Sequence, residues 1–284
     1  MIKVEIDSNS GFCGGVIRAI DTAERFLWER DGRLFSLGAI VHNEEELERL
    51  GAKGLVALAG DEIDDVVMYG VETILIRAHG VAPEIYEKLR LKGFEIIDCT
   101  CPVVLNIQKQ IRRSAGQVLI FGKHGHPEVL GLVGQNSRAK VFDSLEQLED
   151  ALAEINPEEP LDVFSQTTMS PVQYKRACDI ISRVVPGSNI HNTICKQVAS
   201  RHGELSTFAR EHDAVIFVSG SHSSNGKVLY DLCKSENPRT WRVSAIEDIK
   251  PEWFRPGDFV GVSGATSTPK WLLEKVASAI ENLQ

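Results

Sequence analysis

The feature that most constrains the fold of this chain is a unit that recurs along it. Each copy is a short apolar run, then a loop of small and polar residues, then the expected start of a helix. Four copies are TILIRAHGVAP at 73–83, QVLIFGKHGHPE at 117–128, AVIFVSGSHSSN at 214–225 and FVGVSGATSTP at 259–269. Repetition of one small unit predicts several similar domains rather than one large sheet.

Short apolar runs rich in Val, Ile and Phe are typical of parallel strands buried on both faces. We expect such strands at 3–6, 34–37, 73–76, 94–97, 117–121, 161–164, 214–218 and 259–262. Amphipathic stretches follow most of them, including 16–29, 44–50 and 171–184, with Asn43 as an N-cap and Gly51 as a helix stop. The acidic run at 44–46 is interpreted as a solvated first turn. Alternation of strands and helices predicts an α/β fold with parallel sheets.

Charge and composition exclude several classes of protein. The net charge of −9 argues against a general nucleic-acid binder, which normally presents a basic face. No apolar run approaches the roughly 18 residues of a membrane span, and the N-terminal residues lack the pattern of a signal peptide. We therefore expect a cytoplasmic protein, in which six cysteines are core residues or ligands rather than a disulfide framework.

Polar loops follow the expected strands, where open α/β sheets bind their ligands. They lie at 11–15, 41–44, 78–80, 99–102, 124–128, 166–168, 193–195, 223–225 and 266–269. Such loops offer free backbone N–H groups and the positive end of a helix dipole, which suits a phosphate. One such loop is common, but this many in one chain, several with histidine, favour an anion site.

The cysteines divide by context. Three lie at expected helix starts, where the thiolate is favoured: Cys13, Cys101 and Cys195. Cys178 and Cys233 fall inside expected helices and are interpreted as small buried hydrophobes. Cys99 shares a loop with Cys101 and could be a ligand or a spectator. The spacing matches neither the paired pattern of zinc sites nor the ferredoxin run, so spacing alone does not establish a cluster.

Nine motifs, in order along the chain, resemble those of the LytB family of 4-hydroxy-3-methylbut-2-enyl diphosphate reductases. They are GFCGGV (11–16), IVHN (40–43), AHGV (78–81), TCPVV (100–104), GHPEV (125–129), SQTTMS (165–170), NTIC (192–195), SSN (223–225) and SGATSTP (263–269). Nine motifs in family order are far more specific than any one of them.

The resemblance implies three small, similar α/β domains in a pseudo-threefold trefoil around a central iron–sulfur cluster. The expected domains are 14–100, 101–194 and 195–284, the last completed by the N-terminal strand within 1–13. The cofactor would be one [4Fe–4S] cluster with Cys13, Cys101 and Cys195 as ligands and one open iron for the substrate. Cys101 is preferred to Cys99 because the PVV match follows it directly.

The resemblance also implies a set of substrate-binding residues: His42, His79, His126, Thr167, Ser223, Ser224, Asn225 and Ser267. Among these, His42 and His79 would hold the diphosphate. His126 is preferred to His124 because Pro and Glu follow it directly. Glu128 would be the catalytic residue that supplies protons, and Thr167 would orient Glu128 or the substrate oxygen.

The implied reaction is the reductive dehydroxylation of 4-hydroxy-3-methylbut-2-enyl diphosphate to isopentenyl and dimethylallyl diphosphate, the last step of the non-mevalonate route. The sequence G-F-C-G-G lacks the spacing of a dinucleotide loop, so a partner protein must deliver electrons, a ferredoxin or flavodoxin by family analogy. Few Lys or Arg lie in the motif loops. We therefore hypothesise that at least one of His42 and His79 is protonated when the diphosphate is bound.

Taken singly, these residues have simpler interpretations. Each histidine could be a hydrogen-bonded structural residue, and Glu128 could be a first-turn acid that complements its helix dipole. Two other function classes also remain: an iron–sulfur dehydratase of another small hydroxy compound, and a non-catalytic anion-binding or redox-sensing module. A requirement for reductant separates the first alternative from the reductase. Absence of a chromophore in anaerobically purified protein would favour the second.

Overall fold

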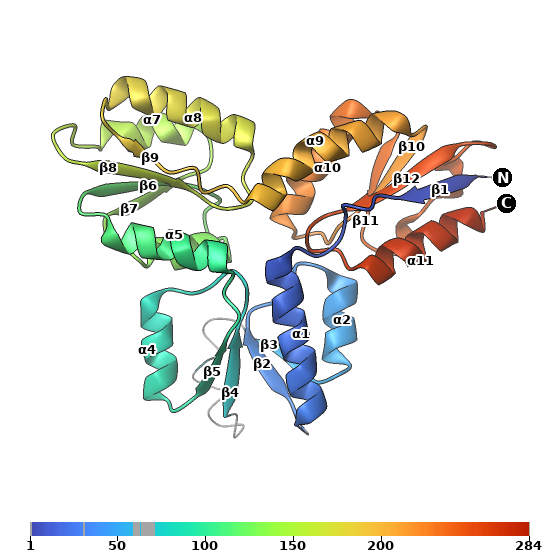
Figure 1. The fold of residues 1–284 in the computed structure, drawn as a ribbon, viewed down its shortest axis with the longest axis horizontal. Helices are drawn as coiled ribbons and strands as arrows, with labels where there is room; N and C mark the ends of the chain where they lie inside the picture. The colour runs from blue at the N-terminus through green and yellow to red at the C-terminus, as the bar shows by residue number, and fades with distance from the viewer. Residues whose placement is uncertain (1, 31, 59–62, 64–71, 284) are drawn as a thin grey trace. The chain divides into compact units, whose positions relative to one another are not determined.

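The strands form three four-stranded sheets in the computed structural model, which describes residues 2–30, 32–58, 63 and 72–283 (Figure 1). The strands are β1 (Lys3–Ile6), β2 (Leu34–Leu37), β3 (Leu55–Leu58), β4 (Thr73–Ile76), β5 (Glu95–Asp98), β6 (Gln117–Phe121), β7 (Ala139–Phe142), β8 (Leu161–Ser165), β9 (Asn189–Ile190), β10 (Ala214–Val218), β11 (Thr240–Val243) and β12 (Phe259–Gly264). The helices are α1 (Gly14–Glu29), α2 (Glu44–Gly51), α4 (Pro83–Leu91), α5 (Pro102–Arg113), α6 (Pro127–Val133), α7 (Leu145–Ala153), α8 (Pro171–Val184), α9 (Lys196–Glu211), α10 (Ser224–Glu236) and α11 (Lys270–Glu281).

All eight expected strands are present, as β1, β2, β4, β5, β6, β8, β10 and β12. The sheet orders are β1-β12-β10-β11, β3-β2-β4-β5 and β7-β6-β8-β9. The strands that the sequence analysis missed are β3, β7, β9 and β11, and each lies at a sheet edge. The repeated unit is a strand that feeds a helix, as in β4–α4, β6–α6, β10–α10 and β12–α11. The predicted α/β fold with similar units is confirmed.

The chain divides into two compact units, and the first contains the sheet β1-β12-β10-β11. This unit comprises Met1–Arg33, Ala39–Val56 and Lys196–Gln284. Side chains of β10 alternate between the two faces of the sheet, as a strand requires. Ile216 and Val218 pack with Leu273 of α11, whereas Val215 and Phe217 pack with side chains of α9 and α10. The sheet is therefore covered by helices on both faces.

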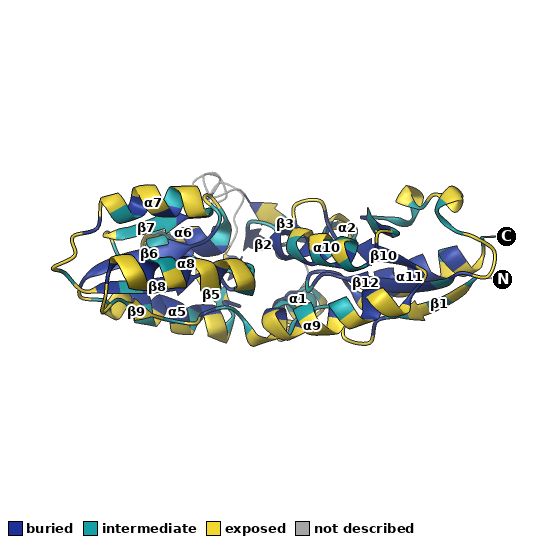
Figure 2. Ribbon diagram, turned by 90° about the horizontal axis from the view of Figure 1, so that it is seen from above, coloured by how far each residue is buried: buried dark blue, intermediate teal, exposed yellow. Residues whose placement is uncertain are grey.

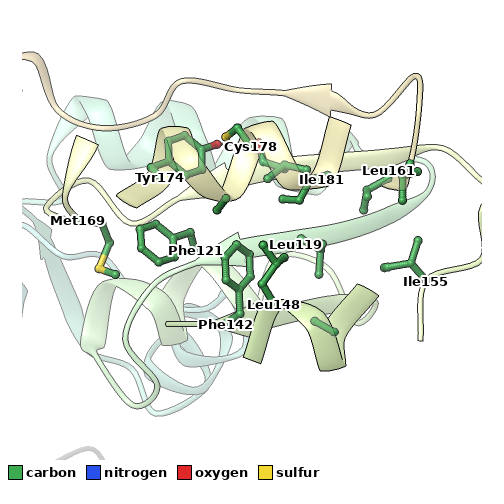
Figure 3. Packing of buried hydrophobic residues seen from close by; sticks show 14 residues of the cluster. Leu119, Phe121, Phe142, Leu148, Ile155, Leu161, Met169, Tyr174, Cys178 and Ile181 are labelled. Atoms are coloured by element: carbon green, nitrogen blue, oxygen red, sulfur yellow. Dashed lines mark hydrogen bonds between the residues drawn. The ribbon is translucent and has the colours of Figure 1, made fainter. Parts of the chain in front are cut away.

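The second unit, Leu34–Gly38 with Ala57–Cys195, contains the sheet β7-β6-β8-β9. Leu119 and Phe121 of β6 pack against α7 and α8, and Phe121 is flanked by the rings of Phe142 and Tyr174 (Figure 3). Val118 and Ile120 on the opposite face pack against α5 and α6. Burial on both faces explains the continuous apolar runs in the sequence. Buried residues concentrate in the strands, and exposed residues on the outer faces of the helices (Figure 2).

Helix starts follow the strands as expected, with small differences in where helices end. Asn43 caps α2 by accepting a hydrogen bond from the Glu46 N–H at 3.0 Å. Gly51, expected to stop this helix, is instead its last residue, because the chain stays helical at Ala52 and turns only at Gly54, where φ is +108°. The described helices include none with the length and apolar character needed to cross a membrane.

Candidate active site

The cysteines separate into accessible and buried groups. Cys13 and Cys101 are the N-cap residues of α1 and α5, and Cys195 directly precedes α9. All three are partly exposed and none is in a disulfide. Cys178 and Cys233 are buried in the core, as predicted, and burial raises the pKa of Cys233 to about 11. Accessible thiols at helix N-termini are of the kind that ligate a metal cluster.

Cys99 and Cys101 are distinguished by their surroundings. Cys99 is 2% exposed at the end of β5, where its N–H donates to the Ile76 carbonyl. Cys101 is more accessible, and its N–H donates to the Ala78 carbonyl at 2.9 Å. The geometry therefore supports Cys101 as the ligand and Cys99 as a core residue.

The Cys195 loop is fastened to the end of β8. The Thr193 hydroxyl accepts from the Ser165 N–H at 2.7 Å and donates to the Ser165 carbonyl at 2.8 Å. The Cys195 N–H donates to the Thr167 carbonyl at 2.9 Å. The backbone of Thr167 therefore holds the Cys195 loop, while its side chain makes a second contact.

That contact is the carboxyl group of Glu128, which is 2% exposed in the first turn of α6. One carboxyl oxygen accepts from the Thr167 N–H at 2.6 Å and the other from the Thr167 hydroxyl at 2.7 Å. Burial raises the pKa of Glu128 to about 7, although the two hydrogen bonds from Thr167 act in the opposite direction. A carboxyl group with this pKa can hold and release a proton at neutral pH.

Two of the predicted histidines lie together near this carboxyl. His126 is the N-cap of α6, and its Nδ1 accepts from the Glu128 N–H at 3.2 Å. Neutral His126 therefore carries its proton on Nε2. The His79 ring meets the His126 ring edge-on, with centroids 5.4 Å apart. His124 is exposed and contacts Gln147 instead, which supports the choice of His126.

In the other unit, the N-terminus of α10 gathers the predicted serines and asparagine. The Ser223 hydroxyl caps the Gly226 N–H at 3.0 Å and lies 3.1 Å from the Ser267 hydroxyl. Asn225 Nδ2 donates to the Thr266 hydroxyl at 2.8 Å. The Ser224 hydroxyl and Asn225 Oδ1 are buried and find no hydrogen-bond partner in the described part of the chain. Buried polar atoms are normally satisfied, so this pattern points to a bound ligand.

The His42 loop lies against the loop that precedes α10. Gly220 approaches so closely that a β-carbon there would overlap the His42 carbonyl oxygen and lie 2.9 Å from the Asn43 Cα. Glu44 fastens the same two loops, because its Oε1 accepts from the Ser221 N–H at 3.0 Å and the Ser221 hydroxyl at 2.5 Å. His42 is therefore held beside the α10 N-terminus.

The run at 44–46 is the first turn of α2, and its interpretation as solvated fits the exposed Glu44 but is wrong for Glu46. Glu46 is fully buried and accepts hydrogen bonds from Trp271 at 2.8 Å and from Arg49. Glu44 is engaged with Ser221, as described above. Gly220 was not predicted, because its only signal in the sequence is a glycine in a strand-to-helix loop. The contact of Glu46 with Arg49 lies within one helix. The contacts with Trp271, Ser221 and Gly220 come from distant segments, so helical spacing could not reveal them.

The predicted site residues thus fall into two groups, one in each unit. Those of the second unit are His79, Cys101, His126, Glu128, Thr167 and Cys195. Those of the first unit are Cys13, His42, Ser223, Ser224, Asn225 and Ser267. The first unit supplies neutral donors and a helix N-terminus suited to an anion. The second supplies a proton-holding carboxyl group beside two histidines.

Comparison with known proteins adds an independent finding. The family described as LytB protein matches residues 4–281 of the chain. The 4-hydroxy-3-methylbut-2-enyl diphosphate reductase of Porphyromonas gingivalis is 46% identical, with 100% of both chains covered. The protein of the same name from Aquifex aeolicus is 35% identical, covering 100% of this chain and 97% of the relative.

Two solved structures resemble the chain over its length. One, titled as the terminal enzyme of the non-mevalonate pathway, (E)-4-hydroxy-3-methyl-but-2-enyl diphosphate reductase, is 34% identical with a TM-score of 0.72 and covers 99% of each chain. The other, an E-1-hydroxy-2-methyl-but-2-enyl-4-diphosphate reductase from Plasmodium falciparum, is 23% identical with a TM-score of 0.89 and covers 99% of this chain and 88% of that one. The second likeness bears on the fold alone.

Proposed function

The chain belongs to the LytB family, and on that premise we propose that it converts 4-hydroxy-3-methylbut-2-enyl diphosphate into isopentenyl and dimethylallyl diphosphate. The C–O bond of the allylic alcohol breaks and a C–H bond forms. The step consumes two electrons and two protons and releases one water. This is a reduction, so the enzyme needs an external electron source but no oxygen atom donor. The reaction closes the non-mevalonate route to isoprenoid precursors.

Cys13, Cys101 and Cys195 would hold one [4Fe–4S] cluster with one open iron. The donor set supports this assignment, because these three thiols are accessible at helix starts whereas Cys99, Cys178 and Cys233 are buried. When bound, such a cluster supplies electrons and a vacant position for the substrate hydroxyl. With three protein ligands, one iron keeps an open position for the substrate. A cluster with four protein ligands would only carry electrons.

Glu128 would hold the proton that the leaving oxygen needs, and this carboxyl group is the observation that carries the proposal. Its pKa of about 7 keeps it substantially protonated at neutral pH. Thr167 fixes both carboxyl oxygens and therefore sets the direction in which the proton points. An acid that only complemented its helix dipole would not need to be buried against a second loop.

The diphosphate would bind at the N-terminus of α10, held by Ser223, Ser224, Asn225 and Ser267. The buried Ser224 hydroxyl can donate to a phosphate oxygen. Asn225 can do the same if its amide turns over, because the Thr266 hydroxyl can donate as well as accept. Both groups are neutral, which leaves the negative charge to the helix dipole and the histidines.

His42 and His79 would contribute to diphosphate binding, with His126 in the same pocket, and we propose that at least one of the first two is charged in the complex. A dianion raises the pKa of a neighbouring imidazole above its ordinary value near 6.5. Substrate affinity should then weaken as the pH rises from 7 to 9. An affinity that stays constant across this range would count against a charged histidine.

We propose an electron-donor protein, a ferredoxin or flavodoxin, as the partner, because the motif loops include no dinucleotide-binding pattern. A cytoplasmic location fits thiol ligands that must stay reduced. We also propose three domains, 14–100, 101–194 and 195–284 with 1–13, with one ligand cysteine at the start of each domain or directly before it. The pairing of β1 with β12 supports assigning the N-terminal strand to the last of them.

The function is tested by anaerobic turnover with a chemical reductant. Protein purified without oxygen is mixed with reduced methyl viologen and the diphosphate substrate, and products are identified by NMR. We expect both isopentenyl and dimethylallyl diphosphate and a requirement for the reductant. Conversion of a hydroxy substrate without any reductant would indicate a dehydratase instead.

A further inference from the structure

We propose that the face formed by α4 and α5 is the docking surface for the electron carrier, and that the carrier is an acidic protein. The inference rests on the proposed reductase function, which requires such a partner. It adds the location of the contact and the charge of the protein that makes it.

The charge of α5 sets this helix apart from the rest of the chain. This helix carries Lys109, Arg112 and Arg113 and contains neither Asp nor Glu. Its side-chain charge of about +3 contrasts with −9 for the whole chain and exceeds that of every other described helix. A local patch of opposite sign to the whole protein can orient an acidic partner during encounter.

A groove of about 400 Å³ lies between α4 and α5. Three exposed cations line it: Arg90 from α4, and Lys109 and Arg112 from α5. Two acids, Glu87 and Asp98, also line the groove. Asp98 is already engaged, since its carboxylate accepts from Thr100 and from the Tyr86 hydroxyl at 2.9 Å. Arg112 is likewise engaged, since its guanidinium donates to Gln135 Oε1. Three cations against two acids leave the groove with a net positive charge.

The groove is connected to Cys101 through the first turn of α5. Leu105 lines the groove, and its N–H donates to the Cys101 carbonyl at 2.9 Å, one helical turn away. Asp98 lines it as well, and accepts from the Thr100 N–H, next to Cys101, at 2.9 Å. A carrier seated in the groove would be separated from the candidate ligand by a single turn of helix.

The simplest alternative is that these cations only complement the negative end of their helices. That account suits Arg112 and Arg113, which lie in the last turn of α5. It does not suit Lys109, which lies one turn earlier in the helix and still faces the groove beside Arg90 of the neighbouring helix. Cations from two helices lining one groove indicate a shared surface.

The test compares two double charge reversals in the holoenzyme. Arg90→Glu with Lys109→Glu changes the groove, whereas Arg176→Glu with Arg183→Glu makes the same charge change on exposed positions of α8. An acidic plant-type [2Fe–2S] ferredoxin serves as the probe carrier. Turnover is measured with the reduced ferredoxin and, separately, with reduced methyl viologen. Binding of the oxidised ferredoxin is measured by calorimetry at low and high salt.

We expect the groove variant to raise the KM for ferredoxin at least about tenfold at low salt and to weaken calorimetric binding in parallel. Its turnover with methyl viologen should match wild type, and the α8 variant should match wild type in every assay. Equal effects of both variants, no effect of either, or no ferredoxin binding by wild type would overturn the proposal. Failure of wild type with methyl viologen would instead overturn the proposed function.

Discussion

Replacing Glu128 with Gln tests the role of the buried carboxyl group. Glutamine has nearly the same size and can keep both Thr167 contacts, because its oxygen accepts from the N–H and its amide donates to the hydroxyl. It cannot release a proton to a leaving oxygen. With a pKa of about 7, the wild-type carboxyl is about half protonated at pH 7, roughly one tenth at pH 8 and roughly one hundredth at pH 9. Loss of a general acid costs about 10²- to 10⁴-fold in rate.

The assay is kcat at saturating substrate with reduced methyl viologen between pH 6 and 9, so that a change in substrate affinity does not enter the rate. Wild-type kcat should fall about fivefold from pH 7 to pH 8 and about tenfold from pH 8 to pH 9. At pH 6 Glu128→Gln should be slower than wild type by at least about a hundredfold, and its kcat should show no such fall. Glu154→Gln, a change at an exposed acid, is the control and should follow wild type. Iron content should be equal in all three proteins. A Glu128→Gln enzyme within threefold of wild type, with the same pH slope, would refute the assignment.

The same carboxyl group makes a prediction about stability. Its pKa is raised from 4.5 to about 7 on folding, so between these pH values the folded protein binds more protons than the unfolded chain. Stability from this group is therefore complete below pH 4.5 and lost as the pH rises through 7. This group contributes at most about 3 kcal/mol to the free energy of unfolding, because one pKa unit corresponds to about 1.4 kcal/mol. The Tm of Glu128→Gln minus the Tm of wild type should therefore increase from pH 5 to pH 8. A difference that stays constant would contradict the raised pKa of Glu128.

Further changes probe other parts of the account. Gly220→Ala should raise the substrate KM about tenfold or more with unchanged iron content, because the added methyl group would displace the His42 carbonyl; an unchanged KM would mean that this loop does not bind the diphosphate. Cys101→Ala should abolish cluster assembly whereas Cys99→Ala should retain it, as measured by iron and sulfide content, and the reverse result would exchange their roles. Phe121→Ala should lower stability by about 3–5 kcal/mol in anaerobic denaturant titrations, and a loss under 1 kcal/mol would contradict its place in the core.

All the central strands of the described sheets could be predicted from sequence, whereas among the edge strands only β1 and β5 could. Strands such as β6 and β10 are buried on both faces, which produces an uninterrupted apolar run. The edge strands β9 and β11 carry polar or partly exposed residues and are only two and four residues long. Their pairing depends on a neighbour far along the chain, as when Ile216 pairs with Trp241. Local periodicity contains no information about such a partner.

The candidate site was predictable where its chemistry lies in local motifs. Asn43 as an N-cap and the contrast between Cys101 and the core cysteines follow from position relative to a helix. The burial of Glu46 and the contact of Gly220 with the His42 loop arise from distant segments. The elevated pKa of Glu128 likewise depends on burial against the Thr167 loop, which lies 39 residues away.

The most direct measurement of the central claim is Mössbauer spectroscopy of anaerobically prepared, ⁵⁷Fe-enriched protein, with and without the diphosphate substrate. Three thiolates from residues 13, 101 and 195 predict four irons per chain, one of which has a distinct signal that shifts when the substrate is added. Four equivalent, fully cysteine-ligated irons that ignore the substrate, or a protein that binds no iron at all, would contradict it.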